Sequence, residues 1–208
     1  MRRINFILVA SIAVTFLFGV NSAYAKPVTK EERKAAVKYL KHTQKLFLNS
    51  VKGLSEEQLK WKPAPEKWSV FEVSEHIALA ESFLFDLISG QIMKVPANST
   101  KTSEVTMQQI QTMVPDRTNK FQAPEPIRPD KAPWTLMPDT MDAFKQRRAT
   151  TIGFIESGND DMRERFFMNP AFSKEMDAYL WIAFLSAHTE RHVKQILEVK
   201  ANPGFPKN

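Results

Sequence analysis

Apolar residues recur every three to four positions along most of the chain, a spacing that predicts amphipathic helices and almost no strand. The four long helices expected from this pattern cover about residues 29–51, 69–90, 139–157 and 174–200. Shorter helices are expected just after Ser55 and over about residues 104–113. Four long helices with short connectors predict an all-α protein, an antiparallel four-helix bundle with short connecting helices and one long proline-rich loop.

Three of the expected helix starts carry a capping box, in which a serine or threonine is followed three residues later by glutamate or glutamine. The pairs are Thr29 with Glu32, Ser55 with Gln58, and Ser69 with Glu72. Gly53, Gly90, Gly158 and the run Asn202-Pro203-Gly204 are the expected helix ends. These signals fix the phase of each helix, and so decide which residues face inward.

The proline-rich loop covers residues 114–138, "VPDRTNKFQAPEPIRPDKAPWTLMP". Its prolines and low apolar content predict an ordered loop or lid without long regular elements. Loops of this length are either functional or mobile. The sequence leaves two alternatives open: the loop covers a site, or it is a surface excursion without a role.

The first 25 residues have the pattern of a cleaved signal peptide. Arg2 and Arg3 precede a nearly uncharged run from Ile4 to Val20, and Ala23-Tyr24-Ala25 supplies the small residues of a cleavage site. The apolar run is short for a bilayer-spanning helix, which needs roughly 20 apolar residues. We therefore expect residues 26–208 to form a single exported domain, periplasmic or secreted, with no stable membrane span after cleavage.

The chain contains no cysteine, so no disulfide braces this domain. The formal net charge is +6, and the basic side chains are scattered along the helices. A nucleic-acid surface needs a concentrated basic stripe on a recognisable module, so no nucleic-acid partner is expected. The expected partner is a small-molecule substrate or ligand, and the oligomeric state is left open, a homodimer included.

Three of the four histidines fall on inward-facing helical positions. His188 and His192 are four residues apart, so they lie only about 40° apart around a helix, one turn from each other. His76 lies on the apolar stripe of the helix over residues 69–90, in the segment "WSVFEVSEHIALAE". Neutral imidazoles facing a bundle interior need partners for their ring nitrogens, and a divalent transition metal satisfies all three at once.

Three histidine ligands and an open position are the arrangement of catalytic zinc sites. Nickel, iron and copper also accept imidazoles, so the metal's identity stays open, with zinc, nickel and iron as the candidates. The sequence lacks the metalloprotease motif HExxH: Thr189 follows His188, and Glu190 lies about 200° around the helix from it. His42 lies at the edge of the first helix's apolar stripe. We expect it to be solvated or to contact a ligand residue, and not to bind the metal itself.

Three charged residues near the histidines have competing explanations. Glu72 lies one turn before His76, but its capping role at Ser69 is the simpler explanation. Glu75 points about 100° away from His76, and we expect neither glutamate to be catalytic. Arg191 suits either the neutralisation of an acidic substrate or a surface salt bridge, and we favour the salt bridge.

Two segments resemble the DinB/YfiT-like superfamily: "LSEEQLKWKPAPEKWSVFEVSEHIALAE" and the closing "HTERHVKQI". The resemblance extends over about residues 31–199, although the middle matches only in its helical outline. It implies an antiparallel four-helix bundle with a metal held by His76, His188 and His192, and Arg191 and Gln195 also fall on the family pattern. Relatives include transferases that use bacillithiol or mycothiol and a thiol-dependent maleylpyruvate isomerase.

Two hypotheses of function follow. The first is an exported metalloenzyme whose open metal position activates water or a thiol, for hydrolysis or group transfer on a small molecule. Thiol cofactors belong to the reducing cytosol, so water fits the expected compartment at least as well. The alternative is a non-catalytic protein that binds a metal or a small apolar ligand. Its candidate aromatic residues, which ordinary burial would place in the core, are Phe83, Phe85, Trp181 and Phe184.

Overall fold

The computed structural model describes residues 27–158 and 160–207. The long helices are α1 (Lys30–Val51), α3 (Val70–Gly90), α5 (Met137–Glu156) and α6 (Ala178–Lys200). The shorter ones are α2 (Glu56–Lys60) and α4 (Met107–Met113), and four 3-10 turns are η1 (Ile92–Lys94), η2 (Glu125–Ile127), η3 (Pro129–Lys131) and η4 (Asp160–Glu164). The predicted helical bundle is confirmed.

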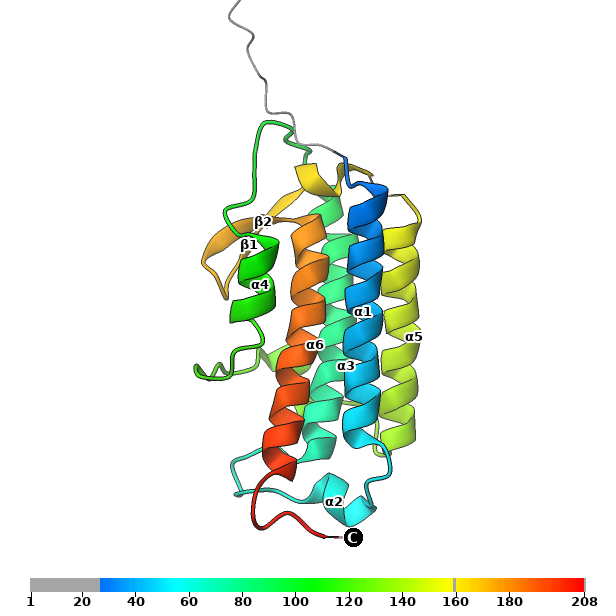
Figure 1. Ribbon diagram of the computed structural model, residues 1–208, viewed down its shortest axis with the longest axis vertical. Coiled ribbons are helices and arrows are strands. Elements are labelled where there is room, and N and C mark those ends of the chain that lie inside the picture. The colour runs from blue at the N-terminus through cyan, green and yellow to red at the C-terminus, as the bar shows by residue number, and fades with distance from the viewer. Residues whose placement is uncertain (1–26, 159, 208) are drawn as a thin grey trace, which may run out of the picture.

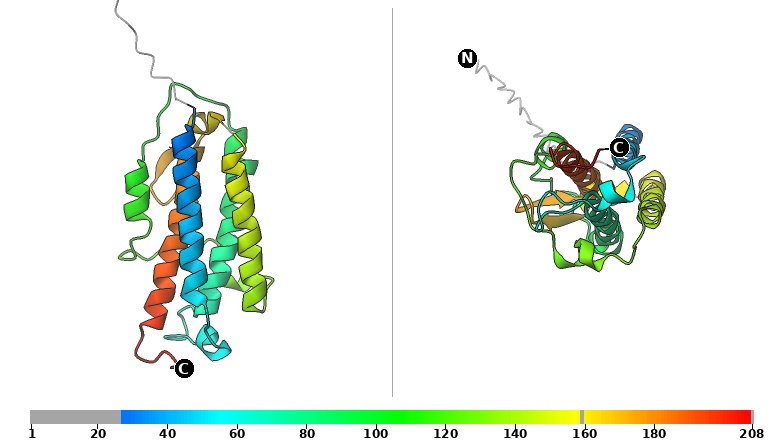
Figure 2. Two further views of the ribbon diagram at one scale, coloured as in Figure 1. Left: turned by 45° about the vertical axis from the view of Figure 1, so that its right-hand side comes forward. Right: turned by 90° about the horizontal axis from the view of Figure 1, so that it is seen from below.

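The four long helices pack as a ring in which each touches two neighbours: α1 with α5 and α6, and α3 with α5 and α6 (Figures 1 and 2). In Figure 1, α1 and α6 run downward while α3 and α5 run upward. The pairs α1–α5 and α3–α6 are therefore antiparallel. Because α3 ends at the top and α5 begins at the bottom, residues 91–136 must return along the whole bundle, carrying α4 and the proline-rich loop.

All three predicted capping boxes are present at α1, α2 and α3. A fourth capping box, between Thr106 and Gln109, opens α4, so this helix begins at Met107 and not at about residue 104 as expected. The helix expected from Asp139 begins slightly earlier, at Met137. Gly53 and Gly158, expected as helix ends, both have positive φ angles of 76° and 93°, which glycine adopts without steric cost.

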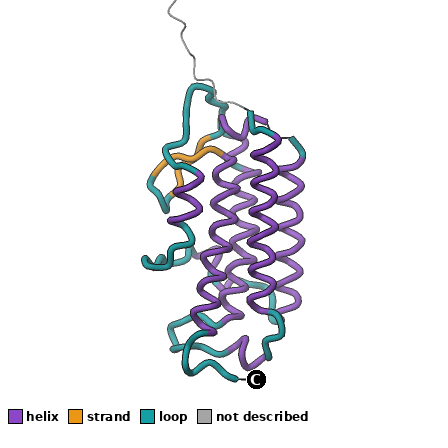
Figure 3. The backbone as a smooth tube through the Cα atoms, in the orientation of Figure 1, coloured by secondary structure: helices purple, strands orange, loops and turns teal. Residues whose placement is uncertain are grey.

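The expectation that the last helix begins near Lys174 is wrong. Lys174–Asp177 form strand β2, which pairs antiparallel with β1 (Phe166–Asn169), and this hairpin is the orange segment in Figure 3. Helix α6 begins only at Ala178, because the Asp177 side chain accepts a hydrogen bond from the Leu180 backbone N–H at 2.8 Å. The hairpin is short, and its residues carry too few alternations to reveal a strand.

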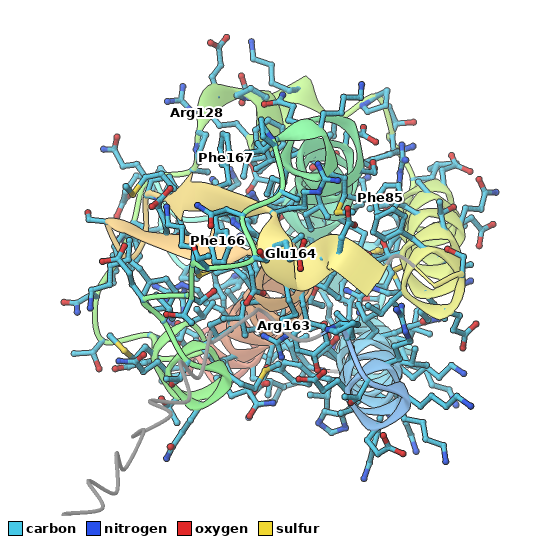
Figure 4. All side chains as sticks on the ribbon, turned by 90° about the horizontal axis from the view of Figure 1, so that it is seen from above. Phe85, Arg128, Arg163, Glu164, Phe166 and Phe167 are labelled. Carbon is cyan, nitrogen blue, oxygen red and sulfur yellow. The ribbon has the colours of Figure 1, made fainter. Side chains whose placement is uncertain are left out.

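The hairpin end of the bundle is closed by Arg163, at the end of η4. Its guanidinium donates to Asp177 Oδ2 at 3.0 Å and to Glu32 at the start of α1, and it lies over the Tyr179 ring at 4.1 Å. Figure 4 shows this end from above, with Arg163 and Glu164 over the helix ends and Phe166 and Phe167 on the hairpin. One side chain therefore ties the hairpin to both α1 and α6.

A fully buried ion pair crosses the middle of the bundle. Arg148 on α5 donates from Nε and Nη2 to the Glu81 carboxylate on α3, at 2.8 and 2.7 Å, and both side chains are 0% exposed. Its other N–H groups reach Leu40 O and Thr43 Oγ1 on α1 and Thr189 Oγ1 on α6. All five guanidinium donors are thus used, so one residue is hydrogen-bonded to each of the other three long helices.

Within residues 27–158 and 160–207, no helix has both the length and the apolar character that crossing a bilayer requires. The expected signal peptide, residues 1–25, lies outside the described residues. Its cleavage and the export of the protein stay predictions.

Candidate metal centre

The three histidines meet between α3 and α6. The Ser69 capping box sets the start of α3 so that His76 turns into the bundle, where its ring is 2% exposed. The antiparallel α6 brings His188 and His192 to the same level. The ring centroids of His76, His188 and His192 are 4.3 to 5.2 Å apart, and one nitrogen from each ring lies within 4.8 Å of the others. The structure brings together all three residues that the sequence singled out.

The His76 ring is oriented by the proline-rich loop. Its Nδ1 lies 2.7 Å from the carbonyl oxygen of Ile127, in η2. A carbonyl oxygen only accepts, so Nδ1 carries the proton and Nε2 presents its lone pair to the centre. The loop thus covers the site, which decides between the two alternatives for this segment.

The His192 ring is oriented by its own helix. Nδ1 lies 2.8 Å from Oε1 of Gln195, and Arg117 Nη1 donates to the same oxygen at 3.2 Å. Because a guanidinium can only donate, that atom is the amide oxygen, and His192 Nδ1 must carry the proton. Its Nε2 therefore also presents a lone pair to the centre.

These two assignments leave two lone pairs facing each other. The Nε2 atoms of His76 and His192 are 3.1 Å apart, at hydrogen-bond distance, but neither ring has a proton there to donate. A cation bound by both lone pairs would remove the repulsion. Two nitrogens bound to one tetrahedral metal at 2.0–2.1 Å lie about 3.3 Å apart, which is close to the observed separation.

A proton is a poor candidate for that cation. Burial lowers the pKa of His76 to about 4, although the hydrogen bond to Ile127 opposes the shift. Burial also holds the pKa of His188 and of His192 well below the ordinary value, and the neighbouring histidines add to this effect. All three rings are consequently neutral at pH 7, the form in which imidazole binds metals. The residues present fit a divalent transition metal.

The surroundings of the triad are aromatic. Trp68 lies against His76, with ring centroids 5.0 Å apart, and Phe184 lies 6.4 Å from His188. Phe172 of the hairpin continues this row at 6.4 Å from Phe184. His76 and His192 are buried, whereas His188 is partly exposed and is the most exposed residue of the three.

The other candidates of the sequence analysis lie elsewhere or have structural roles. His42 is exposed on α1 and does not join the cluster. Glu72 completes the capping box and pairs with Lys62 at 2.7 Å, as its simpler explanation required. Glu75 is 6% exposed, and burial, together with the nearby Glu72, raises the pKa of its carboxyl group to about 7.

The favoured interpretation of Arg191 as a surface salt bridge is wrong. The residue is only 7% exposed, and its guanidinium donates to the backbone carbonyl oxygens of Val114, at 3.1 Å, and of Asp116 and Asn119. It also lies over the ring of Phe121 at 5.2 Å. Arg191 therefore fastens the beginning of the proline-rich loop to α6.

Sequence reasoning missed Ile127 and Arg117, which complete the arrangement. Ile127 acts through its backbone carbonyl, for which a sequence has no signal. Arg117 sits in a loop whose path the sequence does not fix. The position of Gln195, one turn beyond His192, was the one signal available, since a residue three positions on can reach the same side of a helix.

Four long helices, with a three-histidine cluster between α3 and α6, define this protein as a helical bundle with a candidate metal centre. Comparison with known protein families identifies the superfamily. A model of the DinB superfamily matches residues 39–196, most of the chain, and the chain belongs to this superfamily.

Two known proteins are similar to this chain, one in sequence and one in fold. The uncharacterised protein YuaE of Bacillus subtilis is 28% identical over 154 residues, which cover 73% of this chain and 89% of YuaE. The solved structure of YfiT from Bacillus subtilis, described as "a probable metal-dependent hydrolase with an unusual four-helix bundle topology", aligns with a TM-score of 0.55 over 90% of this chain and all of that chain. At 14% identity, this likeness establishes the fold alone.

Proposed function

We propose that this protein is a metal-dependent enzyme in which His76, His188 and His192 hold one divalent transition metal and a small molecule is hydrolysed beside it. The observation that carries the proposal is the pair of facing Nε2 lone pairs, 3.1 Å apart, on two neutral and buried rings. Zinc, nickel and iron are the candidate metals, because all three accept imidazole nitrogens.

When bound, such a metal supplies a Lewis acid that lowers the pKa of a water molecule or thiol. The chain's own residues do the rest. Ile127 and Gln195 hold the protons of His76 and His192 away from the centre, and the partly exposed His188 marks the side on which substrate approaches. The aromatic rings of Trp68 and Phe184 exclude water from the flanks of the triad.

Hydrolysis is preferred over thiol transfer because the chain has no cysteine of its own, so any thiol would have to be a second substrate. The hydrolase description of YfiT, which shares the bundle fold, points the same way. The expected export to an oxidising compartment adds to this preference.

Elemental analysis of protein purified without an affinity tag tests the metal centre. The parent is expected to carry near-stoichiometric metal, and His76→Ala, His188→Ala and His192→Ala are each expected to lose it. His42→Ala is the matched control, since it removes the exposed histidine of α1 and should keep the metal. Full metal retention by His76→Ala would contradict the assignment.

Activity needs a second experiment. Metal-loaded parent and His192→Ala are compared on panels of ester and amide substrates, and on thiol-conjugation substrates with an added low-molecular-weight thiol. Turnover of an ester or amide without added thiol, by the parent but not by His192→Ala, supports hydrolysis. Turnover only with added thiol would replace hydrolysis by group transfer, and stoichiometric metal without turnover on any panel would favour a binding protein.

A further inference from the structure

The proline-rich loop reaches the metal centre at two separate points. The Ile127 carbonyl oxygen accepts a hydrogen bond from His76 Nδ1, and Arg117 donates to the Gln195 amide oxygen, which accepts a hydrogen bond from His192 Nδ1. The two contacts arise from positions ten residues apart in the loop and act on ligands from different helices. Both contacts hold the protonated nitrogen, Nδ1, away from the centre, so both leave the Nε2 lone pair free to bind a metal.

Arg117 is held firmly enough to perform this function. Its Nη2 donates to Glu198 Oε2 at 2.8 Å and its Nε to the same carboxylate at 3.1 Å, while Nη1 turns to Gln195. The side chain is 18% exposed. Arg191 fixes the backbone on both sides, through the carbonyl oxygens of Val114, Asp116 and Asn119.

Gln195 would not hold the His192 tautomer equally well without Arg117. A glutamine amide can present either its oxygen or its NH₂ group to a ring nitrogen, and the NH₂ group would stabilise the opposite tautomer, with the proton on Nε2. The guanidinium accepts nothing, so it binds only the oxygen and selects one orientation of the amide. A proton on Nε2 would block that nitrogen as a ligand.

We infer that Arg117 and Gln195 are positioning residues that set the tautomer of His192, so that the anchored loop and metal binding are energetically coupled. This inference rests on the proposed metal centre and deepens it. Neither residue touches the centre: Gln195 acts through His192, and Arg117 acts through Gln195. Partners of this kind typically change metal affinity by about 10- to 100-fold when they are removed.

The test measures zinc affinity by competition with a chromogenic chelator. Gln195→Leu keeps the size of the side chain but accepts no hydrogen bond, and its zinc affinity is expected to fall about 10- to 100-fold. Gln195→Glu restores an acceptor and is expected to bind zinc at least as tightly as the parent. Arg117→Ala is expected to weaken binding by several-fold. Arg147→Ala is the matched control, because it removes another ion-paired arginine, the partner of Asp86, without contact to the site.

A second readout requires no metal. Long-range ¹H–¹⁵N correlation spectra of the histidine rings in metal-free protein should show His192 protonated on Nδ1 in the parent and in Gln195→Glu. In Gln195→Leu, the ring should shift toward the Nε2-protonated tautomer that a free neutral imidazole favours. If Gln195→Leu acted only through lost packing, the His192 tautomer would not change in that variant and be restored in Gln195→Glu.

The outcomes separate the two proposals. A parent that binds neither zinc, nickel nor iron refutes the proposed function and the coupling to metal binding, whereas the tautomer measurement still decides whether Gln195 and Arg117 set the proton position on His192. Zinc binding by Gln195→Leu within twofold of the parent, or a parent His192 protonated on Nε2, overturns the inference and leaves the metal centre standing.

Discussion

Replacing Arg148 by methionine tests the buried network that joins the four long helices. Methionine fills much of the arginine's volume but leaves the Glu81 carboxylate, which is 0% exposed, without both of its charge-assisted hydrogen bonds. Breaking a buried ion pair from one side costs about 3 to 5 kcal/mol. The melting temperature of a domain of this size changes by roughly 2 to 4 °C per kcal/mol, so a fall of about 6 to 20 °C is expected.

Urea denaturation of four proteins measures the effect: the parent, Arg148→Met, Glu81→Leu and the double variant. The double variant should lose much less stability than the two single changes added together, because it removes the unpaired buried charge. Arg147→Met is the control, since Arg147 pairs with the exposed Asp86 at 3.1 Å and should contribute less than about 1 kcal/mol. The reasoning would be refuted if the double variant lost as much stability as the two single variants together, or if Arg148→Met cost less than about 1 kcal/mol.

Three further results are expected. Free metal at one hundred times its dissociation constant should stabilise the protein by about 2.7 kcal/mol, a rise of roughly 5 to 10 °C by thermal denaturation; a similar rise in His192→Ala would contradict the site. Metal-free protein should lose stability as the pH falls from about 6.5 to 4. Over this range the His76 side chain binds a proton in the unfolded chain but stays neutral in the folded protein, where its pKa is about 4. His76 alone accounts for on the order of 3 kcal/mol of this loss, and His76→Gln should flatten the pH profile of the urea midpoints. Ser69→Ala removes a cap of α3 and should cost about 1 kcal/mol in the same assay, whereas an unchanged midpoint would show that the cap is dispensable.

The parts of the fold that local sequence controls were predictable. Capping boxes and apolar stripes are set within a few residues, so the helix starts at Thr29, Ser55 and Ser69 and the inward orientation of His76 followed from the sequence alone. The hairpin over residues 166–177 did not, because four-residue strands carry too little alternation. The buried pair of Glu81 and Arg148 was also missed: its members are 67 residues apart, and each looks like an ordinary solvated charge.

The site was predictable for a different reason. Histidine is scarce in this chain, so its inward positions stood out and joined His76, His188 and His192 into one set, which the family resemblance then also implied. What orients the rings was not predictable. The Ile127 carbonyl is a backbone atom, and Arg117 meets Gln195 only because the chain crosses over between α3 and α5. Both depend on the path of a loop, which the sequence pattern leaves undetermined.

That crossover also governs how late in folding the centre can assemble. His76 and His192 are separated by 116 positions, with the returning segment between them, so the contacts that unite them form late and slowly compared with those of a simple hairpin of helices. Helix α6 supplies two of the three imidazoles and packs on both α1 and α3. Until α6 docks on α1 and α3, His76 lies at an open seam without His188 and His192, so the three-histidine cluster exists only in a bundle whose long-range contacts have formed.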